Sequence, residues 1–240
     1  MTGKIGLWRQ IKEDFSQPLK NDPAINSRVE LFFNYPGVWA IVNYRIANIL
    51  YRKSFKRLAR AIMGINQFIT NIDIHPAATI GRRVFLDHAF GVVIGETTII
   101  ENDILIYQGV TLGGVNLNRD QKRHPTVQSG SVIGAGAKVL GDIVIGKNCR
   151  IGSNSVVVKS VEDNSTAVGI PARVIKKGRD KNPMAHNKIP DINKELFIYL
   201  FKRLKAIETV VNSEHIDKEL IKKDVELEKI YEQFLKSVKE

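Results

Sequence analysis

The chain has 240 residues, with 36 Lys+Arg and 25 Asp+Glu, which gives a formal net charge of +11. Its length fits one large domain or two small ones, and an apolar fraction of 43% excludes wholesale disorder. A single cysteine excludes a disulfide scaffold or a cysteine-based zinc site and suits the reducing cytoplasm, where we expect the protein to be. No apolar run predicts a transmembrane helix, and residues 1–15 lack the apolar core of a signal peptide.

The positive charge has two possible meanings. It is typical of proteins that bind nucleic acid, a membrane surface or a polyphosphate ligand, but a lysine-rich solvated surface has the same composition. Residues 1–71 carry 11 basic and 4 acidic side chains, whereas residues 72–175 carry 10 and 9. The excess lies mainly in the first segment, so we expect neither nucleic acid nor a membrane as a partner.

The first 71 residues are predicted to form an α-helical region. Apolar side chains follow helical spacing over residues 38–50 and 58–65, and residues 21–23 (Asn-Asp-Pro) indicate a turn between helices. Six basic residues fall on the helical surface in this interpretation, as a solvated face or as a patch for a membrane or polyanion. They are Arg45, Arg52, Lys53, Lys56, Arg57 and Arg60. We expect the solvated face.

Aliphatic residues recur every six positions through the middle of the chain. They are Ile74, Ile80, Leu86, Ile94, Ile100, Ile106, Leu112, Val127, Ile133, Val139, Ile145, Ile151 and Val157, with a two-residue slip after Leu86 and a longer gap after Leu112. A period of six fits neither a helix nor a simple strand, but it is typical of a β-helix in which each hexapeptide forms one flat face. Residues four places later are mostly small or β-branched, and Cys149 occupies one of these positions as a predicted buried side chain.

Beyond Gly178 the composition changes to a polar linker between Pro183 and Pro190. Residues 197–211 and 227–238 then show the 3–4 apolar spacing of two amphipathic helices that could pair. The sequence therefore predicts a mainly β fold in three parts. These are an α-helical N-terminal region (1–71), a parallel β-helix domain (72–177), and a linker with a C-terminal helical extension (178–240).

The two breaks in the repeat are candidate functional loops. The first contains Asp87-His88, and the second, residues 113–126, contains Arg123-His124. Asp73 and His88 are fifteen residues apart, so in a triangular coil of about eighteen residues they could lie near one edge, where a carboxylate could orient a histidine general base. Two alternatives stay open: surface residues at loop ends, or a zinc site made of His75, His88 and His124.

Several motifs resemble those of bacterial serine O-acetyltransferases over about residues 20–176. The matching strings are Asp22-Pro23-Ala24, Asp73-Ile74-His75-Pro76, Leu86-Asp87-His88-Ala89, Val93-Ile94-Gly95-Glu96-Thr97, Thr111-Leu112-Gly113-Gly114, Arg123-His124-Pro125, Gly134-Ala135-Gly136-Ala137-Lys138 and Gly169-Ile170-Pro171-Ala172-Arg173. Hexapeptide repeats alone indicate only the broad acyltransferase superfamily, whereas the Asp-Ile-His-Pro, Leu-Asp-His-Ala and Arg-His-Pro strings narrow the resemblance to this enzyme family.

The resemblance implies a left-handed parallel β-helix, an exception to the right-handed crossover rule. It implies transfer of acetyl from acetyl-CoA to the L-serine hydroxyl, giving O-acetyl-L-serine and CoA for cysteine biosynthesis, with no metal. His88 would be the general base and Asp73 would orient it, and the serine oxygen would attack the thioester directly. Asp22 and Asp87 would hold the serine ammonium, and Arg123 and His124 its carboxylate.

For coenzyme A the resemblance points to Gly114, Ala135 and Ser153. Ala135 and Ser153 are eighteen residues apart, so we expect them on adjacent coils, where small residues let a pantetheine arm approach the backbone. Lys138, Arg150 and Arg173 are candidate phosphate partners, with a solvated surface as the alternative for each.

The resemblance also implies a homotrimer with its sites between neighbouring subunits, and possibly a dimer of trimers, although the N-terminal region is short for that assembly. L-Cysteine is expected as a feedback inhibitor. The family's terminal isoleucine, which inserts into O-acetylserine sulfhydrylase, is absent, because the chain ends Val238-Lys239-Glu240. A complex with that partner is therefore doubtful.

Three alternative functions remain. A related hexapeptide acetyltransferase could use another hydroxyl acceptor such as a sugar, although Asp22 and the Arg123-His124 pair favour an amino acid. A zinc lyase of the γ-carbonic anhydrase kind is also a β-helix. A third alternative is a non-catalytic scaffold that binds partners through its helices.

Overall fold

The computed structural model describes residues 6–25, 27–118, 120–177, 197–198, 200–205 and 207. The chain divides into two compact units, Met1–Ile189 and Pro190–Glu240. The described residues of the second unit are helical, and the rings of Phe197 and Phe201 stack with their centroids 6.3 Å apart. The predicted helix at 227–238 lies outside the described residues, and the domain boundaries at 71 and 177 stay a prediction. None of the helices within the described ranges is long and apolar enough to cross a membrane.

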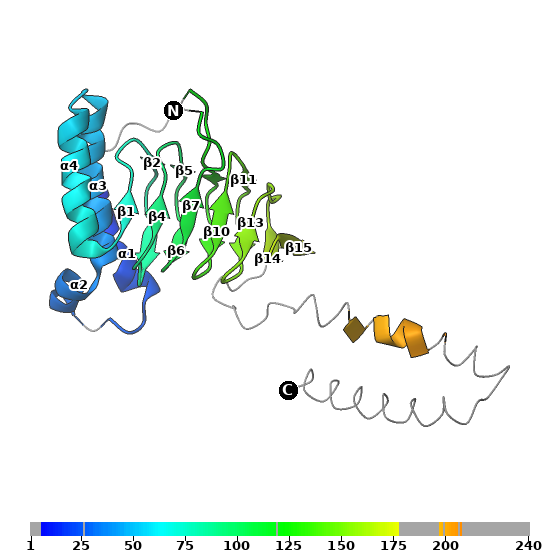
Figure 1. Ribbon diagram of the computed structural model, residues 1–240. Coiled ribbons are helices and arrows are strands. Elements are labelled where there is room, and N and C mark those ends of the chain that lie inside the picture. The colour runs from blue at the N-terminus through cyan, green and yellow to red at the C-terminus, as the bar shows by residue number, and fades with distance from the viewer. Residues whose placement is uncertain are drawn as a thin grey trace. The chain divides into compact units, whose positions relative to one another are not determined.

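Helices occupy the start of the first unit, as the apolar spacing predicts. They are α1 (Leu7–Asn21), α2 (Arg28–Asn34), α3 (Pro36–Arg52) and α4 (Lys56–Thr70). The predicted turn is confirmed, because α1 ends at Asn21. α2 begins where the Ser27 side chain accepts a hydrogen bond from the Glu30 amide, and α3 begins with Pro36, which suits the first helical position. Figure 1 shows α3 and α4 packed side by side at the β1 end of the coil.

From Asp73 to Lys177 the described residues form a parallel β-helix of short strands, as the six-residue period predicts. Its three faces are sheets A, B and C, and the coil passes from A to B to C before it rises one level. Sheet A contains β1 (Asp73–Ile74), β4 (Val93–Ile94), β7 (Thr111–Gly113), β10 (Lys138–Leu140) and β13 (Val156–Val157). Sheet B contains β2 (Thr79–Ile80), β5 (Ile99–Ile100), β8 (Thr126–Val127) and β11 (Val144–Ile145). Sheet C contains β3 (Phe85–Asp87), β6 (Leu105–Tyr107), β9 (Val132–Ile133), β12 (Arg150–Ile151), β14 (Ser165–Gly169) and β15 (Ala172–Lys177).

The register of the strands explains the interruptions of the repeat. Asp73 pairs with Val93, so the first coil has twenty residues, two more than the step from Val93 to Thr111. The two extra residues are the slip after Leu86. The long gap is a loop that leaves the coil after β7 and returns at β8. The fold is a left-handed parallel β-helix, closed at its far end by the antiparallel hairpin β14–β15.

All thirteen aliphatic positions of the repeat are buried, which confirms the predicted interior columns. A fully buried side chain of this kind contributes about 1.5–3 kcal/mol, so the stacked columns are the main source of stability. Cys149 lies in the interior as predicted. Its thiol donates to the Glu162 carbonyl at 2.9 Å, and burial raises the pKa of the thiol. Phe90, the large residue at the slip, is 58% exposed.

The expectation of a solvated basic helix face is wrong for Arg45. Its guanidinium is buried and donates to both carboxylate oxygens of Asp14 at 3.1 Å. It also donates to the carbonyls of Ile80 at 2.7 Å and Gly81 at 2.6 Å. Sequence spacing gives no warning of this contact, because Asp14 and Gly81 are 31 and 36 residues away. Arg45 therefore joins α1, α3 and the first coil.

Candidate active site

Two edges of the coil carry the candidate functional residues. We call the column of turns that lead from sheet C to sheet A the C–A edge, and the column of turns that lead from sheet A to sheet B the A–B edge. Asp87, the last residue of β3, and His88, which follows it, lie at the C–A edge. Arg123 and His124 lie at the A–B edge, in the loop between β7 and β8.

The slip at the C–A edge forms a tight turn that presents His88. His88 and Ala89 both have positive φ angles, 55° and 47°, which is uncommon for two consecutive residues other than glycine. Hydrogen bonds from the Ala89 amide to the Asp87 carbonyl (2.6 Å) and from the Gly91 amide to the Asn71 carbonyl (2.8 Å) hold the turn. Strained backbone of this kind is often found at functional sites, where the surrounding structure stabilises it.

A cavity of 240 Å³ opens beside this turn and brings three predicted residues together. Asp22, Asp87 and His88 line it, with Tyr35 and Glu30 on its helical side. Hydrogen bonds from the Tyr35 hydroxyl (2.6 Å) and the Ala24 amide (2.8 Å) lower the pKa of Asp22. Burial, with the negative charge of Asp22 nearby, raises the pKa of Asp87. The cavity therefore combines three carboxyl groups with a histidine, a combination suited to a cationic amine and a proton transfer.

Two tyrosines of this site were not predicted from the sequence. Tyr35 orients the Asp22 carboxylate, and burial raises the pKa of its hydroxyl. Tyr107 pairs with Asp87 across β3 and β6, and burial, then the charges of Asp87 and Asp22, raises its pKa. The repeat contains a signal for Tyr107, because it stands twenty residues after Asp87, the length of the first coil. No repeat or motif points to Tyr35.

Asp73 lies on β1 at the start of sheet A, directly below the end of the His88 turn. Its amide donates to the Val92 carbonyl at 2.9 Å. The spacing argument for one shared edge therefore agrees with the coil. Within the described part of the chain, however, no side-chain hydrogen bond joins Asp73 to His88, and the paired role of these two residues stays a prediction.

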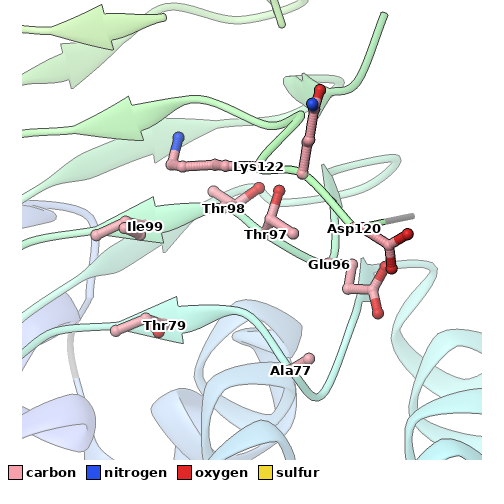
Figure 2. A pocket seen from close by; sticks show the side chains of 9 residues that line it. Ala77, Thr79, Glu96, Thr97, Thr98, Ile99, Asp120 and Lys122 are labelled. Carbon is pink, nitrogen blue, oxygen red and sulfur yellow. The ribbon is translucent and has the colours of Figure 1, made fainter. Parts of the chain in front are cut away.

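The second break folds back over the A–B edge. The Arg123 guanidinium pairs with Glu96 at 2.5 Å, and the buried His124 ring contacts Thr97. Burial, then the positive charge of Arg123, lowers the pKa of His124. Figure 2 shows the loop with Asp120 and Lys122 passing over the turn that carries Glu96 and Thr97, beside an open hollow of 360 Å³. Glu96 and Thr97 belong to one of the matching strings, but no role was predicted for either.

The structure does not bring the three histidines of the zinc alternative together. His75 lies in the turn after β1 at the A–B edge, near His124, whereas His88 lies at the C–A edge. Among the described residues, no group of three His, Cys, Asp or Glu side chains is placed to hold a metal ion.

The residues predicted for coenzyme A also divide between the edges. Ala135 and Ser153 lie on adjacent coils of the C–A edge as predicted, since Ile133 pairs with Ile151 and Lys138 with Val156. Gly91, Gly109 and Gly136 occupy successive turns of this edge with positive φ angles, and an added Cβ would meet only backbone at Gly91 and Gly109 but the Asn154 side chain at Gly136. Gly114 lies instead at the A–B edge, where an added Cβ would be 3.3 Å from the His124 ring.

The candidate phosphate partners differ in exposure. Arg173 is exposed on β15. The Lys138 ammonium donates to the Gly109 carbonyl on the C–A edge. Arg150 is buried on β12, so the expectation of a surface side chain is wrong for this residue in the single chain.

The coil, its polar edges and its six-residue repeat define a class of proteins, the hexapeptide-repeat acyltransferases. Residues 124–159 match the family described as "Bacterial transferase hexapeptide (six repeats)". The serine acetyltransferase of Bacillus pumilus (strain SAFR-032) is 44% identical over 206 residues, which cover 84% of this chain and 93% of the relative. The chain belongs to the serine acetyltransferase family, and the protein is an acyltransferase.

Solved structures of the family have the same fold. The serine acetyltransferase of Brucella abortus strain S19 in complex with coenzyme A is 39% identical, with a TM-score of 0.68, over 71% of this chain and 68% of that one. A serine acetyltransferase in complex with cysteine is 42% identical, with a TM-score of 0.69, over 71% of this chain and 70% of that one.

Proposed function

We propose that the protein transfers the acetyl group of acetyl-CoA to the hydroxyl of L-serine and releases O-acetyl-L-serine and CoA, in the cytoplasm, for cysteine biosynthesis. The family name and the coenzyme A complex of the Brucella relative support this reaction. The observation that carries it is the cavity in which Asp22, Asp87 and His88 meet. An amino acid that binds there meets two carboxyl groups for its ammonium and one imidazole for its hydroxyl.

In this proposal His88 is the catalytic base. Its ring takes the serine hydroxyl proton while the oxygen attacks the acetyl carbonyl. The tetrahedral adduct then collapses, the C–S bond breaks, and the proton passes from His88 to the departing CoA thiolate. Asp73 orients the ring and stabilises the imidazolium that forms, as a carboxylate does in other histidine-based sites. No covalent enzyme intermediate is needed.

The acceptor is held at both ends. Asp22 and Asp87 bind its ammonium, and Arg123 and His124 bind its carboxylate. The two pairs lie on different edges of the coil, so one small amino acid bridges a C–A edge and an A–B edge. We infer that these edges come from neighbouring subunits of a homotrimer, with a dimer of trimers as the larger alternative. The heterologous, ring-closing contact of a cyclic trimer brings two different surfaces together in this way.

Coenzyme A lies along the C–A edge in this proposal. Ala135 and Ser153 line it, and their small side chains let the pantetheine arm approach the backbone. Gly114 lies at the A–B edge, so in the trimer it reaches the thioester from the neighbouring subunit. Lys138 and Arg173 are the phosphate partners. No step of this chemistry calls for a metal ion.

L-Cysteine is the expected competitor, because it has the same ammonium and carboxylate as L-serine. The cysteine complex of a relative supports this expectation. The test is a measurement of serine-dependent rates at millimolar L-cysteine, where we expect competition with L-serine.

Thiol release from acetyl-CoA tests the reaction, with L-serine, L-homoserine and simple sugars as acceptors. We expect release with L-serine, and release with a sugar alone would refute the assignment. A requirement for stoichiometric zinc would support the lyase alternative, and no acceptor-dependent release would support a scaffold.

His88→Ala tests the catalytic base. We expect kcat to fall by about 10²- to 10⁴-fold, the usual contribution of a general base, while the Kd for CoA stays near that of the wild type. Asp73→Asn should lower kcat by a smaller factor, because it changes only the orientation of the His88 ring. Near-normal turnover in His88→Ala would contradict the proposed mechanism.

A further inference from the structure

The His124 ring is tightly packed at the A–B edge. It lies flat against Gly95, where a Cβ added to that glycine would overlap Cδ2 and Nε2 of the ring. Only 8% of the residue is exposed. Any residue larger than glycine at position 95 would therefore displace the ring. The orientation of the imidazole is fixed from below by the backbone of the turn after β4.

The hydroxyl of Thr97 fixes the ring from one side. It accepts hydrogen bonds from the Arg123 amide (3.0 Å) and the His124 amide (3.1 Å). A hydroxyl oxygen has two acceptor lone pairs, and these two amides occupy both. The hydroxyl therefore has only its own proton to offer to His124 Nδ1, which lies 2.9 Å away.

The Thr97 amide leads to the same assignment. It lies 3.2 Å from His124 Nδ1 and can only donate. Two donors thus converge on Nδ1, and this nitrogen has no proton of its own. The ring is then neutral and carries its proton on Nε2, since an imidazolium would place an N–H against both donors.

The charged groups around the ring agree with a neutral imidazole. A positive charge on the His124 ring is disfavoured by Arg123 and Lys122 on the same loop, and by His75 in the turn after β1. Glu96 in the turn after β4 is the one group described nearby that favours it. Burial is the largest effect, and together these influences lower the pKa of His124.

The Nε2–H group is a buried donor for which the described residues supply no acceptor. The contacts of the described residues give Nε2 no acceptor. A buried donor without a partner costs about 1–3 kcal/mol, so such a group in a native site calls for an explanation. Gly114 lies in front of Nε2, where an added Cβ would be 3.3 Å away, so only the absence of a side chain leaves the nitrogen open. An oxygen acceptor of a ligand is the partner that this geometry fits.

We propose that Thr97 is a positioning residue: its hydroxyl and amide hold His124 as the neutral Nε2–H tautomer, and the ring offers an uncharged donor to a carboxylate oxygen of the acceptor. This inference rests on the proposed function, and it adds the protonation state and the residue that sets it. Arg123 then supplies the positive charge that binds the carboxylate, and His124 takes no part in proton transfer.

The direct test is the ¹⁵N spectrum of the full chain labelled in histidine. The chain has five histidines, and the His124 resonances are those lost in His124→Gln. At neutral pH we expect a protonated Nε2 and an unprotonated Nδ1. A protonated Nδ1, in either the neutral ring or the imidazolium, would overturn the proposal. This readout does not need turnover, so it separates the proposal from the proposed function, which fails if serine is not acetylated.

Thr97→Val and Thr97→Ser supply the kinetic test. The valine variant loses the hydroxyl, so we expect the KM for L-serine to rise about tenfold, with the KM for acetyl-CoA nearly unchanged. It also removes a hydrogen bond to the neutral ring, so the pKa of His124 should rise in the same spectra. The serine variant keeps the hydroxyl and should stay within about twofold of the wild type.

Thr166→Val is the matched control, because Thr166 lies on β14 and no side-chain hydrogen bond is described for it. It should leave both Michaelis constants unchanged. Equal losses in Thr97→Val and Thr97→Ser, with the tautomer unaltered in both, would show that Thr97 only supports the fold and would overturn its positioning role.

Discussion

At the scale of single residues, the proposed acceptor cavity places Asp22 and Asp87 in surroundings that shift their pKa values in opposite directions. Asp22 accepts hydrogen bonds from Tyr35 and Ala24, so it stays ionised to a lower pH than an ordinary aspartate. Asp87 is desolvated and faces the charge of Asp22, so it keeps its proton to a higher pH. Ammonium binding needs ionised carboxylates, so acidification should weaken binding at Asp87 first. Asp22 is then the anion that persists beside His88.

Tyr35→Phe tests this arrangement. The change removes the hydroxyl that donates to Asp22 at 2.6 Å, so the pKa of Asp22 should rise towards its ordinary value. We expect the KM for L-serine to rise by roughly threefold to tenfold with kcat little changed, which corresponds to the loss of one ordinary hydrogen bond. The further loss of kcat/KM at low pH, where Asp22 takes up its proton after Asp87, should begin at a higher pH. Initial rates over a range of serine concentration and pH measure both effects.

The control for this prediction is Tyr51→Phe. This variant also removes a tyrosine hydroxyl, but at a position on α3 where no hydrogen bond of the hydroxyl is described. The Tyr51 ring contacts His75. Its serine KM and its acid limb should match the wild type. An unchanged KM and an unchanged profile in Tyr35→Phe would show that Asp22 does not depend on the phenol.

At the scale of elements, the buried Arg45 connects the helices to the coil through its ion pair with Asp14 and its hydrogen bonds to the first coil. Removing one member of a buried ion pair leaves the other desolvated and unpaired, which typically costs about 3–5 kcal/mol. We expect Arg45→Met to lower the free energy of unfolding by about this amount, because Asp14 and the carbonyls of Ile80 and Gly81 lose their donor. Urea unfolding measures the change.

Two further variants serve as controls for the Arg45→Met prediction. Arg57→Met removes an exposed arginine of α4 for which no side-chain partner is described, and it should change the free energy of unfolding by less than about 0.5 kcal/mol. The double variant Asp14→Leu with Arg45→Met removes both charges and should recover a large part of the loss. A single variant as stable as the wild type would show that Arg45 does not connect the helices to the coil.

The elements also show what a sequence can and cannot predict here. The period of six identified every buried column from Ile74 to Val157, because each coil repeats one local pattern. The two breaks of that period located His88 and His124. Contacts between the helices and the coil, such as those of Arg45, follow no period. The side chains of Tyr35 and Thr97 act through hydrogen bonds to Asp22 and His124 across 13 and 27 residues, and neither spacing nor composition encodes such a contact.

At the scale of the whole molecule, our proposal assigns two unlike halves of a site to the two edges of one chain. The C–A edge carries carboxyl groups and His88, and the A–B edge carries Arg123 and His124. Charge complementarity favours an amino acid zwitterion between such edges, with its ammonium on one and its carboxylate on the other. A ring of subunits repeats this contact once per subunit, which gives one site at each interface. The oligomer is then a requirement of the chemistry, and a single subunit should be inactive.

Mixed oligomers test this requirement. His88→Ala removes the base from the C–A edge, and Arg123→Ala removes the cation from the A–B edge, so each variant alone should be nearly inactive. In trimers formed by refolding an equal mixture, an interface is intact when a chain with His88 faces a neighbour with Arg123, which occurs at about one quarter of the interfaces. We expect the mixture to recover up to that fraction of wild-type thiol release, whereas the variants refolded separately and then combined should recover none. If both halves of a site came from one chain, no mixture would contain an intact site, and recovery would be absent in either procedure.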